Sequence, residues 1–345
     1  MTTQLDTSVG LAPETTYGTF VAPTHFVEPT SETLDLNLTV VNGTGMRPGR
    51  RTTTTRQRAV EKRSVSGDIE VEADYDELGI LLAAAFGSVT SKPIATSSHT
   101  YQHVFTPFAD YLPSYSVQKG IPPLGGGAAI PWSFTGMQAN QFEFSAKTGA
   151  VPTCKVTFVG KDAKSVENGA PTFTTPTYPS TSELLSFTGG SIVVGGTVTA
   201  PTSTALATGG TAVATVTDCD IKLDNALDSA GYTLGGGGTR TRPGAALLAK
   251  PTGTLTAEFR DTTFWSQYLG QNQLTLVLDF KGSATTDSTR ELQIYIPAIA
   301  LDGDTPKAKA GSIVTQSINF TVLQDMVNGL PMLEAVLRNT IQSYA

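Results

Sequence analysis

Two runs of strictly alternating apolar and polar residues lie on either side of a long basic stretch near the start of the chain. They read LDLNLTVV at 34–41 and GDIEVEA at 67–73. Because side chains along a β-strand point to opposite faces in turn, each run predicts a strand with one buried face and one wet face. The stretch between them, residues 43–66, contains seven Lys and Arg residues and a single acid, Glu61. The pattern predicts two paired strands joined by a long, exposed, basic loop.

The composition agrees with a β-rich protein. Only 15% of the 345 residues are charged, while 34 are Gly and 20 are Pro. Sparse charge with many turn formers favours strands and turns over helices. The formal net charge of −7 argues against a general nucleic-acid binder, since phosphate contacts need a basic surface. The length allows two domains of ordinary size.

The period changes after the second alternating run. In DYDELGILLAAAFG at 74–87, Asp74 is placed to cap a helix and Gly87 to end it. The apolar residues that fall on one helical stripe are Leu78, Leu81, Leu82, Ala85 and Phe86. Further strand patterns follow at 99–106, 114–119, 131–136, 140–147 and 154–160. Together these elements predict a small antiparallel β-sandwich with one short helix.

The second half of the chain repeats the order of the first. Arg-Pro-Gly at 47–49 recurs at 242–244, and residues 253–270 align without a gap with residues 67–84. This alignment places Leu255, Ala257 and Phe259 in the core, and a closing strand at 318–325 aligns with 155–162. The chain is therefore predicted to be all-β, with two tandem antiparallel β-sandwich units and one short helix per unit. The predicted segments are an N-terminal arm at 1–33, a first unit at 34–160, a linker or outer decoration at 161–215, a second unit at 216–325 and a C-terminal arm at 326–345.

Groups that could carry out catalysis or bind a metal are sparse. The histidines are His25, His99 and His103, and the last two lie in a strand-like segment about 13 Å apart, too far for one metal ion. They are expected on the surface or in loops. The Gly-rich stretches at 125–127 and 235–238 lack the Lys-Ser/Thr helix start that a phosphate site needs. We therefore expect no enzyme activity, no metal site and no cofactor.

The cysteines and apolar runs indicate a soluble protein. Cys154 and Cys219 are the only cysteines, too few for a disulfide framework. The first ten residues do not resemble a signal peptide, and the longest apolar run, at 80–86, is far too short to span a membrane. These features predict a chain made in a reducing cytoplasm, with no membrane association.

The polar face of the second alternating run is acidic. Asp68, Glu70 and Glu72 lie about 7 Å apart along one strand, and like charges in a row are tolerated where water is close. This face would repel DNA bound to the adjoining loop, and the loop lacks the aromatic residues typical of single-strand binding. The basic loop is therefore expected to dock onto an acidic protein surface, which another copy of the chain supplies.

Several segments resemble the tail tube proteins (major tail proteins) of long-tailed bacteriophages. The likeness begins with GLAPETTYGTFVAPTHFVEPTSETLDL at 10–36 and continues through the loop, the Gly-led strand and the helix. It returns with CDIKLDNALDSAGYTLGG at 219–236 and LRNTIQSYA at 337–345. Family members form rings that stack into a hollow tube for DNA, with an inner β-barrel made of sheets from all units. The resemblance implies a structural protein of the virion tail that assembles in the host cytoplasm.

The resemblance also implies partners and roles. Two units per chain would make a ring of three chains, a pseudo-hexamer, with an ordinary hexamer as the alternative. Other expected partners are the tape measure protein and the tail-tip and terminator proteins, while DNA passes through without specific binding. The residues expected in inter-ring stacking loops are Arg47, Arg50, Arg51, Arg56, Arg58, Arg63, Arg240 and Arg242. Those expected to line the lumen are Asp35, Asn37, Thr39, Asp68, Glu70, Glu72, Lys222, Thr254, Thr256 and Glu258.

Two other classes of protein remain open from the sequence. A tail-tip or baseplate hub protein can share the tube fold but is present as a single ring. A carbohydrate-binding adhesin would fit the composition, but it would need aromatic platforms on exposed loops, which here are rich in Gly, Thr and Arg.

Overall fold

The structure is a computed structural model that describes residues 6–344 apart from 95–98, 108–110, 125, 285–288, 304, 308–310, 312 and 327. Strands dominate these residues, together with two short α-helices, α1 (Leu78–Phe86) and α2 (Thr263–Leu269). The predicted all-β fold with one short helix in each half is confirmed. Neither helix of the described ranges is long and apolar enough to cross a membrane.

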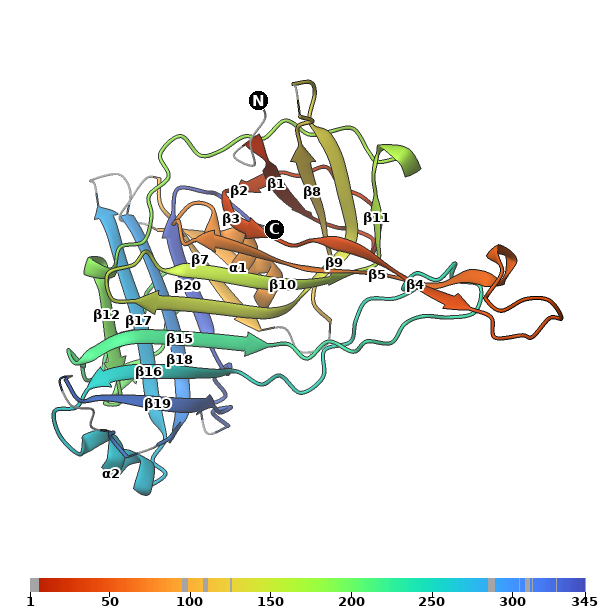
Figure 1. The fold of residues 1–345 in the computed structure, drawn as a ribbon. Coiled ribbons are helices and arrows are strands. Elements are labelled where there is room, and N and C mark those ends of the chain that lie inside the picture. The colour runs from red at the N-terminus through yellow and green to blue at the C-terminus, as the bar shows by residue number, and fades with distance from the viewer. Residues whose placement is uncertain are drawn as a thin grey trace.

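The strands carry the labels of Figure 1. Those of the first half are β1 (Ser8–Pro13), β2 (His25–Val27), β3 (Pro29–Glu32), β4 (Asp35–Asn42), β5 (Arg58–Glu72), β6 (Gly87–Pro93), β7 (Tyr101–Pro107), β8 (Tyr115–Ile121), β9 (Ile130–Lys147), β10 (Thr153–Gly160) and β11 (Asp162–Lys164). Those that follow are β12 (Gly190–Val194), β13 (Val198–Thr199), β14 (Thr208–Gly209), β15 (Val216–Asp224), β16 (Thr252–Glu258), β17 (Leu274–Ala284), β18 (Thr289–Asp302), β19 (Thr315–Val322) and β20 (Glu334–Asn339).

One continuous antiparallel sheet, here called the inner sheet, runs through both halves of the chain (Figure 1). Its strand order is β4-β5-β10-β9-β15-β16-β19-β18. The halves meet where β9 pairs with β15, which places Phe144 opposite Ile221. Backbone hydrogen bonds therefore join the two halves directly.

Outer strands complete a sandwich over one face of the inner sheet. The long strands β9 and β18 belong to both layers, because their N-terminal parts pair with outer strands: β9 with β8 and β11, and β18 with β17 and β20. β1 and β2 extend the outer layer beside β8, β12 flanks β17, and the β6–β7 hairpin joins β20. The core includes the fully buried side chains of Ile69, Phe142, Phe144, Ile221 and Phe320.

The two halves of the inner sheet have the same internal order. β4-β5-β10-β9 corresponds to β15-β16-β19-β18, and in each half a glycine faces a buried phenylalanine. Gly67 lies opposite Phe158, and Gly253 lies opposite Phe320. A Cβ on Gly253 would lie 2.2 Å from the Phe320 ring, so the ring needs a glycine there. The register of these strands agrees with the predicted alignment of residues 67–84 with 253–270.

The predicted alignment of the closing strands is one residue out of phase. Val156 pairs with Ile69, and Ile318 pairs with Leu255. The alignment of residues 67–84 with 253–270 matches Ile69 to Leu255, so the pairing matches Val156 to Ile318, whereas the sequence alignment of the closing strands matched Lys155 to Ile318. Alternation alone defines which residues share a face, but a slip of one residue exchanges the faces.

The two helices differ in their burial. Every residue of α1 is buried, and Gly79 leaves room for the Tyr344 ring, which a Cβ would approach to 2.1 Å. The single predicted apolar stripe is therefore too narrow, because β6, β7 and the C-terminal residues also cover this helix. No residue of α2 is buried, and Phe259, predicted to lie in the core, is 41% exposed. Among the described residues, no hairpin packs on α2 as the β6–β7 hairpin packs on α1.

Segments expected to be arms or a linker contribute to the sandwich. Within the predicted N-terminal arm, residues 8–32 form β1, β2 and β3, and the buried side chains of Val9 and Leu11 lie on β1, which pairs with β8. After residue 326, β20 inserts between β18 and β7. Residues 161–215 supply β11, β12 and the small β13–β14 hairpin.

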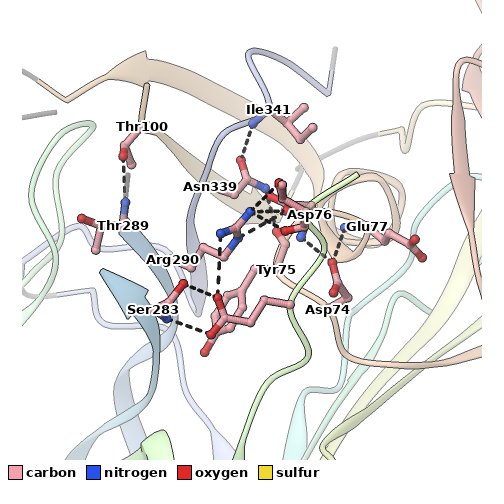
Figure 2. A network of polar contacts seen from close by, with 12 residues as sticks. Asp74, Tyr75, Asp76, Glu77, Thr100, Ser283, Thr289, Arg290, Asn339 and Ile341 are labelled. Carbon is pink, nitrogen blue, oxygen red and sulfur yellow. Dashed lines mark hydrogen bonds and ion pairs between the residues drawn. The ribbon is translucent and has the colours of Figure 1, made fainter. Parts of the chain in front are cut away.

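A buried ion pair ties the first half of the chain to the second (Figure 2). Arg290 on β18 donates to the Asp76 carboxylate just before α1 at 2.8 Å, and their side chains are 9% and 0% exposed. The same guanidinium donates to the Thr181 carbonyl oxygen at 2.7 Å. Burial raises the pKa of the neighbouring carboxyls Asp74 and Glu77 to about 6 and about 7. Arg290 is thus the counter-ion at an otherwise acidic junction.

Replacing Arg290 with Met should lower the free energy of unfolding by about 3–5 kcal/mol, because the Asp76 carboxylate stays buried without its counter-ion. Urea unfolding of the unassembled chain measures this loss. The double change Asp76→Leu with Arg290→Met removes both charges and should recover most of the stability. Equal losses in the single and double variants would contradict the role of this pair.

Candidate functional site

The face of the inner sheet that points away from the core is polar across its whole width. In β10 and β19, accessible and buried positions alternate without interruption. Strand register places every predicted lumen residue on this surface, here called the polar face: Asp35, Asn37, Thr39, Asp68, Glu70, Glu72, Lys222, Thr254, Thr256 and Glu258. Residues from both halves of the chain therefore form one surface.

Charges of opposite sign alternate across the middle of the polar face. Glu70 lies opposite Lys155, Lys155 opposite Glu143, and Glu143 opposite Lys222. Lys155 contacts Asp68 at 2.8 Å, and Lys222 lies 4.0 Å from Glu143. Partial burial opposes the ionisation of Asp68, but hydrogen bonds led by that from Lys155 outweigh it and lower the pKa. Lys155 thus favours the ionised form of Asp68 on the polar face.

Carboxylates outnumber ammonium groups on the polar face. The acids are Asp35, Asp68, Glu70, Glu72, Glu143, Asp218, Asp220, Asp224, Glu258 and Asp302. The bases are Lys62, Lys147, Lys155 and Lys222. The face therefore presents a negative potential to whatever lies in front of it.

Much of the polar face was not predicted from the sequence. The polar-face residues not predicted include Gln141, Glu143, Ser145, Thr153, Lys155, Thr157, Asp218, Asp220, Asp224, Asp302 and Asn319. The signal was present as alternation in QFEFS at 141–145 and DCDIKLD at 218–224. Alternation identifies a wet face on each strand, but only the pairing of β9 with β15 shows that these faces are one.

The basic loop forms the tip of a two-stranded arm. β4 and β5 extend beyond the rest of the sheet and project from one end of the molecule (Figure 1). Residues 41–53 are all exposed, and Met46 in the loop is fully exposed. The Gln57 side chain closes the loop by donating to the Gly45 carbonyl oxygen at 3.1 Å. The tip thereby presents four predicted stacking residues to solvent: Arg47, Arg50, Arg51 and Arg56.

The other predicted stacking arginines lie outside the loop that forms the tip, residues 43–57. Arg58 begins β5 and is exposed, while Arg63 lies further along β5 and pairs with Asp162 at 2.8 Å. Arg240 is 4% exposed, and both Arg240 and Arg242 form ion pairs with Asp228. The structure therefore does not bring the two Arg-Pro-Gly loops into equivalent surroundings.

His103 and both cysteines are buried inside the protein. His103 is fully buried between Ser91 and Asn339, and burial lowers its pKa to about 4, so its predicted surface position is wrong. Burial raises the pKa of the thiols of Cys154 and Cys219. Within the described ranges, His, Cys, Asp and Glu side chains form no group that could hold a metal ion.

The site thus consists of a bare polar sheet face and a projecting basic arm on a β-sandwich. The sequence matches the family model described as phage tail tube protein over residues 4–322, a range that includes the arm and the polar face. The chain therefore belongs to the phage tail tube protein family and is a structural protein of the phage tail. A comparison with curated proteins found no match.

Proposed function

We propose that this chain assembles into rings, that the rings stack into a tail tube, and that the polar face lines the lumen through which DNA leaves. The observation that carries the proposal is the polar face itself, which extends over every strand from β4 to β18 while the opposite face is buried core. A sheet with one wet acidic face and one buried face suits a conduit wall. DNA then passes without specific binding, since a wall of carboxylates repels phosphates.

Each ring contains three chains in this proposal, and each chain derives from two fused tube units. The junction of β9 with β15 inside the chain supports it. In the repeated strand order, β18 corresponds to β9 and β4 corresponds to β15. A junction between chains that repeats the β9–β15 pairing therefore joins β18 of one copy to β4 of the next. Among the described residues, the outer edge of β4 has no strand partner. Closing the ring in this way removes exposed sheet edges.

The arm tip makes the contact between rings. Exposed acids lie near α2, at the end of the molecule opposite the arm: Glu258 ends β16 and Asp261 follows it (Figure 1). Rings stacked in one direction bring this end of one ring to the arginines of the next. Charge complementarity of this kind steers association and fixes register. The tape measure protein and the tail-tip and terminator proteins are the other proposed partners, in the host cytoplasm during assembly and in the virion tail afterwards.

Negative-stain electron microscopy of the purified, concentrated protein tests self-assembly. Tubes of many stacked rings are expected, with or without added tail-tip extract. Rings that stay single under all these conditions would instead support a hub protein, and a chain that never associates would contradict the proposal.

A further inference from the structure

The second Arg-Pro-Gly loop, residues 225–251, runs beside the arm and turns back before the arm tip (Figure 1). We propose that this loop is a bracket that holds the arm in its extended direction, so that each chain presents one inter-ring arm rather than two. The inference deepens the proposed function, because it states which surface of the chain meets the next ring. A ring of three chains then contacts its neighbour through three arms.

The bracket is fixed at its base to the first half of the chain. The Asn225 side chain, 6% exposed, donates to the carbonyl oxygens of Ala85 at the end of α1 and of Ala139 on β9, at 2.9 and 3.0 Å. In the part of the loop that runs back towards β16, the backbone N–H of Gly244 donates to the Gln138 side chain. Both ends of the loop are therefore held against β9.

Asp228 organises the interior of the bracket. Its carboxylate accepts hydrogen bonds from Arg240, from Arg242 and from the backbone N–H of Ala245. The Arg240 guanidinium also donates to the carbonyl oxygen of Ala230 at 3.1 Å and to that of Asp228. The hydrogen bond from Arg242 is the main reason that the pKa of Asp228 is low. The Arg240 guanidinium is therefore bound to residues of its own loop rather than presented to the next ring.

The middle of the bracket contacts the part of the arm that extends beyond β10. The Gly238 carbonyl oxygen accepts a hydrogen bond from the backbone N–H of Arg63 on β5 at 2.8 Å. The Lys62 ammonium lies 4.2 Å from the centre of the Tyr232 ring, a cation–π distance. These contacts lie on β5 just beyond the last residue that β10 pairs, Val65.

The arm needs such support because an isolated two-stranded ribbon is marginally stable in water. Large apolar side chains of the arm are exposed, including Leu38 and Val60 at 51% and 57%. A bracketed arm loses less conformational freedom when it docks onto the next ring, which favours binding. The second loop thereby contributes to stacking without touching the next ring.

Hydrogen exchange on the unassembled chain tests the bracket independently of the proposed function. A Cβ on Gly238, whose φ is +77°, would lie 3.2 Å from the Glu61 carbonyl oxygen, whereas a Cβ on Gly235, whose φ is +87°, meets nothing within 4 Å. Gly238→Val and Gly235→Val therefore carry similar backbone strain, but only the first presses against the arm. In Gly238→Val the Arg63 amide should exchange about three- to tenfold faster, the effect of losing one backbone hydrogen bond. Equal exchange in both variants would overturn the bracket.

Measurements of tube growth test whether each chain has one inter-ring arm or two. Met46 lies in the arm loop and Leu234 in the bracket, and both side chains are fully exposed. Met46→Asp should shorten the tubes, and Leu234→Asp should leave their length unchanged. If Leu234→Asp impairs stacking as Met46→Asp does, the second loop is itself a stacking arm and the inference fails. Wild-type protein that forms no tubes would count against the proposed function, and the exchange comparison would still decide on the bracket.

Discussion

Phage particles whose tube chain carries Asp68→Lys, Glu70→Lys and Glu72→Lys are expected to have complete tails and to release their DNA poorly at low salt. The three changes place cations on the polar face of every chain, and a cationic lumen binds phosphates by releasing their counterions. With 6–10 phosphate contacts, affinity falls by about 10³–10⁵ between roughly 50 and 200 mM salt, so DNA release should recover as salt is raised over that range. The measurement is the rate of genome release from purified particles triggered at several salt concentrations.

The neutral variant Asp68→Asn, Glu70→Gln, Glu72→Gln is the matched control. It changes the same positions without adding cations, and it should release DNA at nearly the wild-type rate. Both variants lose the contact of Lys155 with Asp68, which is partly exposed and worth at most about 1 kcal/mol. Normal release from the lysine variant at low salt would show that the polar face does not meet DNA.

A chain that carries Arg47→Glu, Arg50→Glu and Arg51→Glu is expected to form rings that do not stack. These side chains are exposed at the arm tip, so their replacement leaves the core intact. Reversing the charge turns attraction to the acidic end of the next ring into repulsion, and electrostatic steering alone changes association rates by about 10–10³-fold. Tube growth followed by light scattering measures the rate, and electron microscopy shows whether rings persist.

The substitution of lysine for the same three arginines separates charge from arginine geometry. This variant keeps the positive charge and should form tubes, with growth that slows as salt is raised because the charges lie at the surface. If the glutamate variant grows tubes at the wild-type rate, the arm tip does not supply the contact between rings.

The strands of the inner sheet could be predicted because their alternation is strict. In β5, Ile69 and Val71 face the core while Asp68, Glu70 and Glu72 stay accessible, as the period of two requires. The pairing of β9 with β15 could not be predicted, since nothing local in either strand names its partner. The width of the polar face depends on that long-range pairing.

The burial of α1 and of His103 was predicted wrongly because segments distant in sequence pack on them. α1 reads as amphipathic, but Tyr344 near the C-terminus packs on Gly79 and completes its burial. His103 is a polar residue in a strand and is nevertheless fully buried, because Asn339 and Ile341 supply hydrogen-bond partners for its ring. The periodicity of a short segment does not show which distant residues pack against it.

The repeated Arg-Pro-Gly shows a further limit. The motif at 47–49 lies at the exposed tip of the arm, whereas at 242–244 it follows Arg240, which Asp228 holds inside the loop. Two loops with the same short motif therefore differ because one has an internal counter-ion. The presence of Asp228 in the sequence is the signal that could have separated them.

The number of chains in one ring can be measured by electron cryomicroscopy of assembled tubes viewed along the axis. We expect three copies per ring and six similar lobes around a lumen lined by the polar face, with the β9–β15 junction repeated between β18 and β4 of neighbouring chains. Rings of six copies, or a lumen lined by any other surface of the chain, would contradict it.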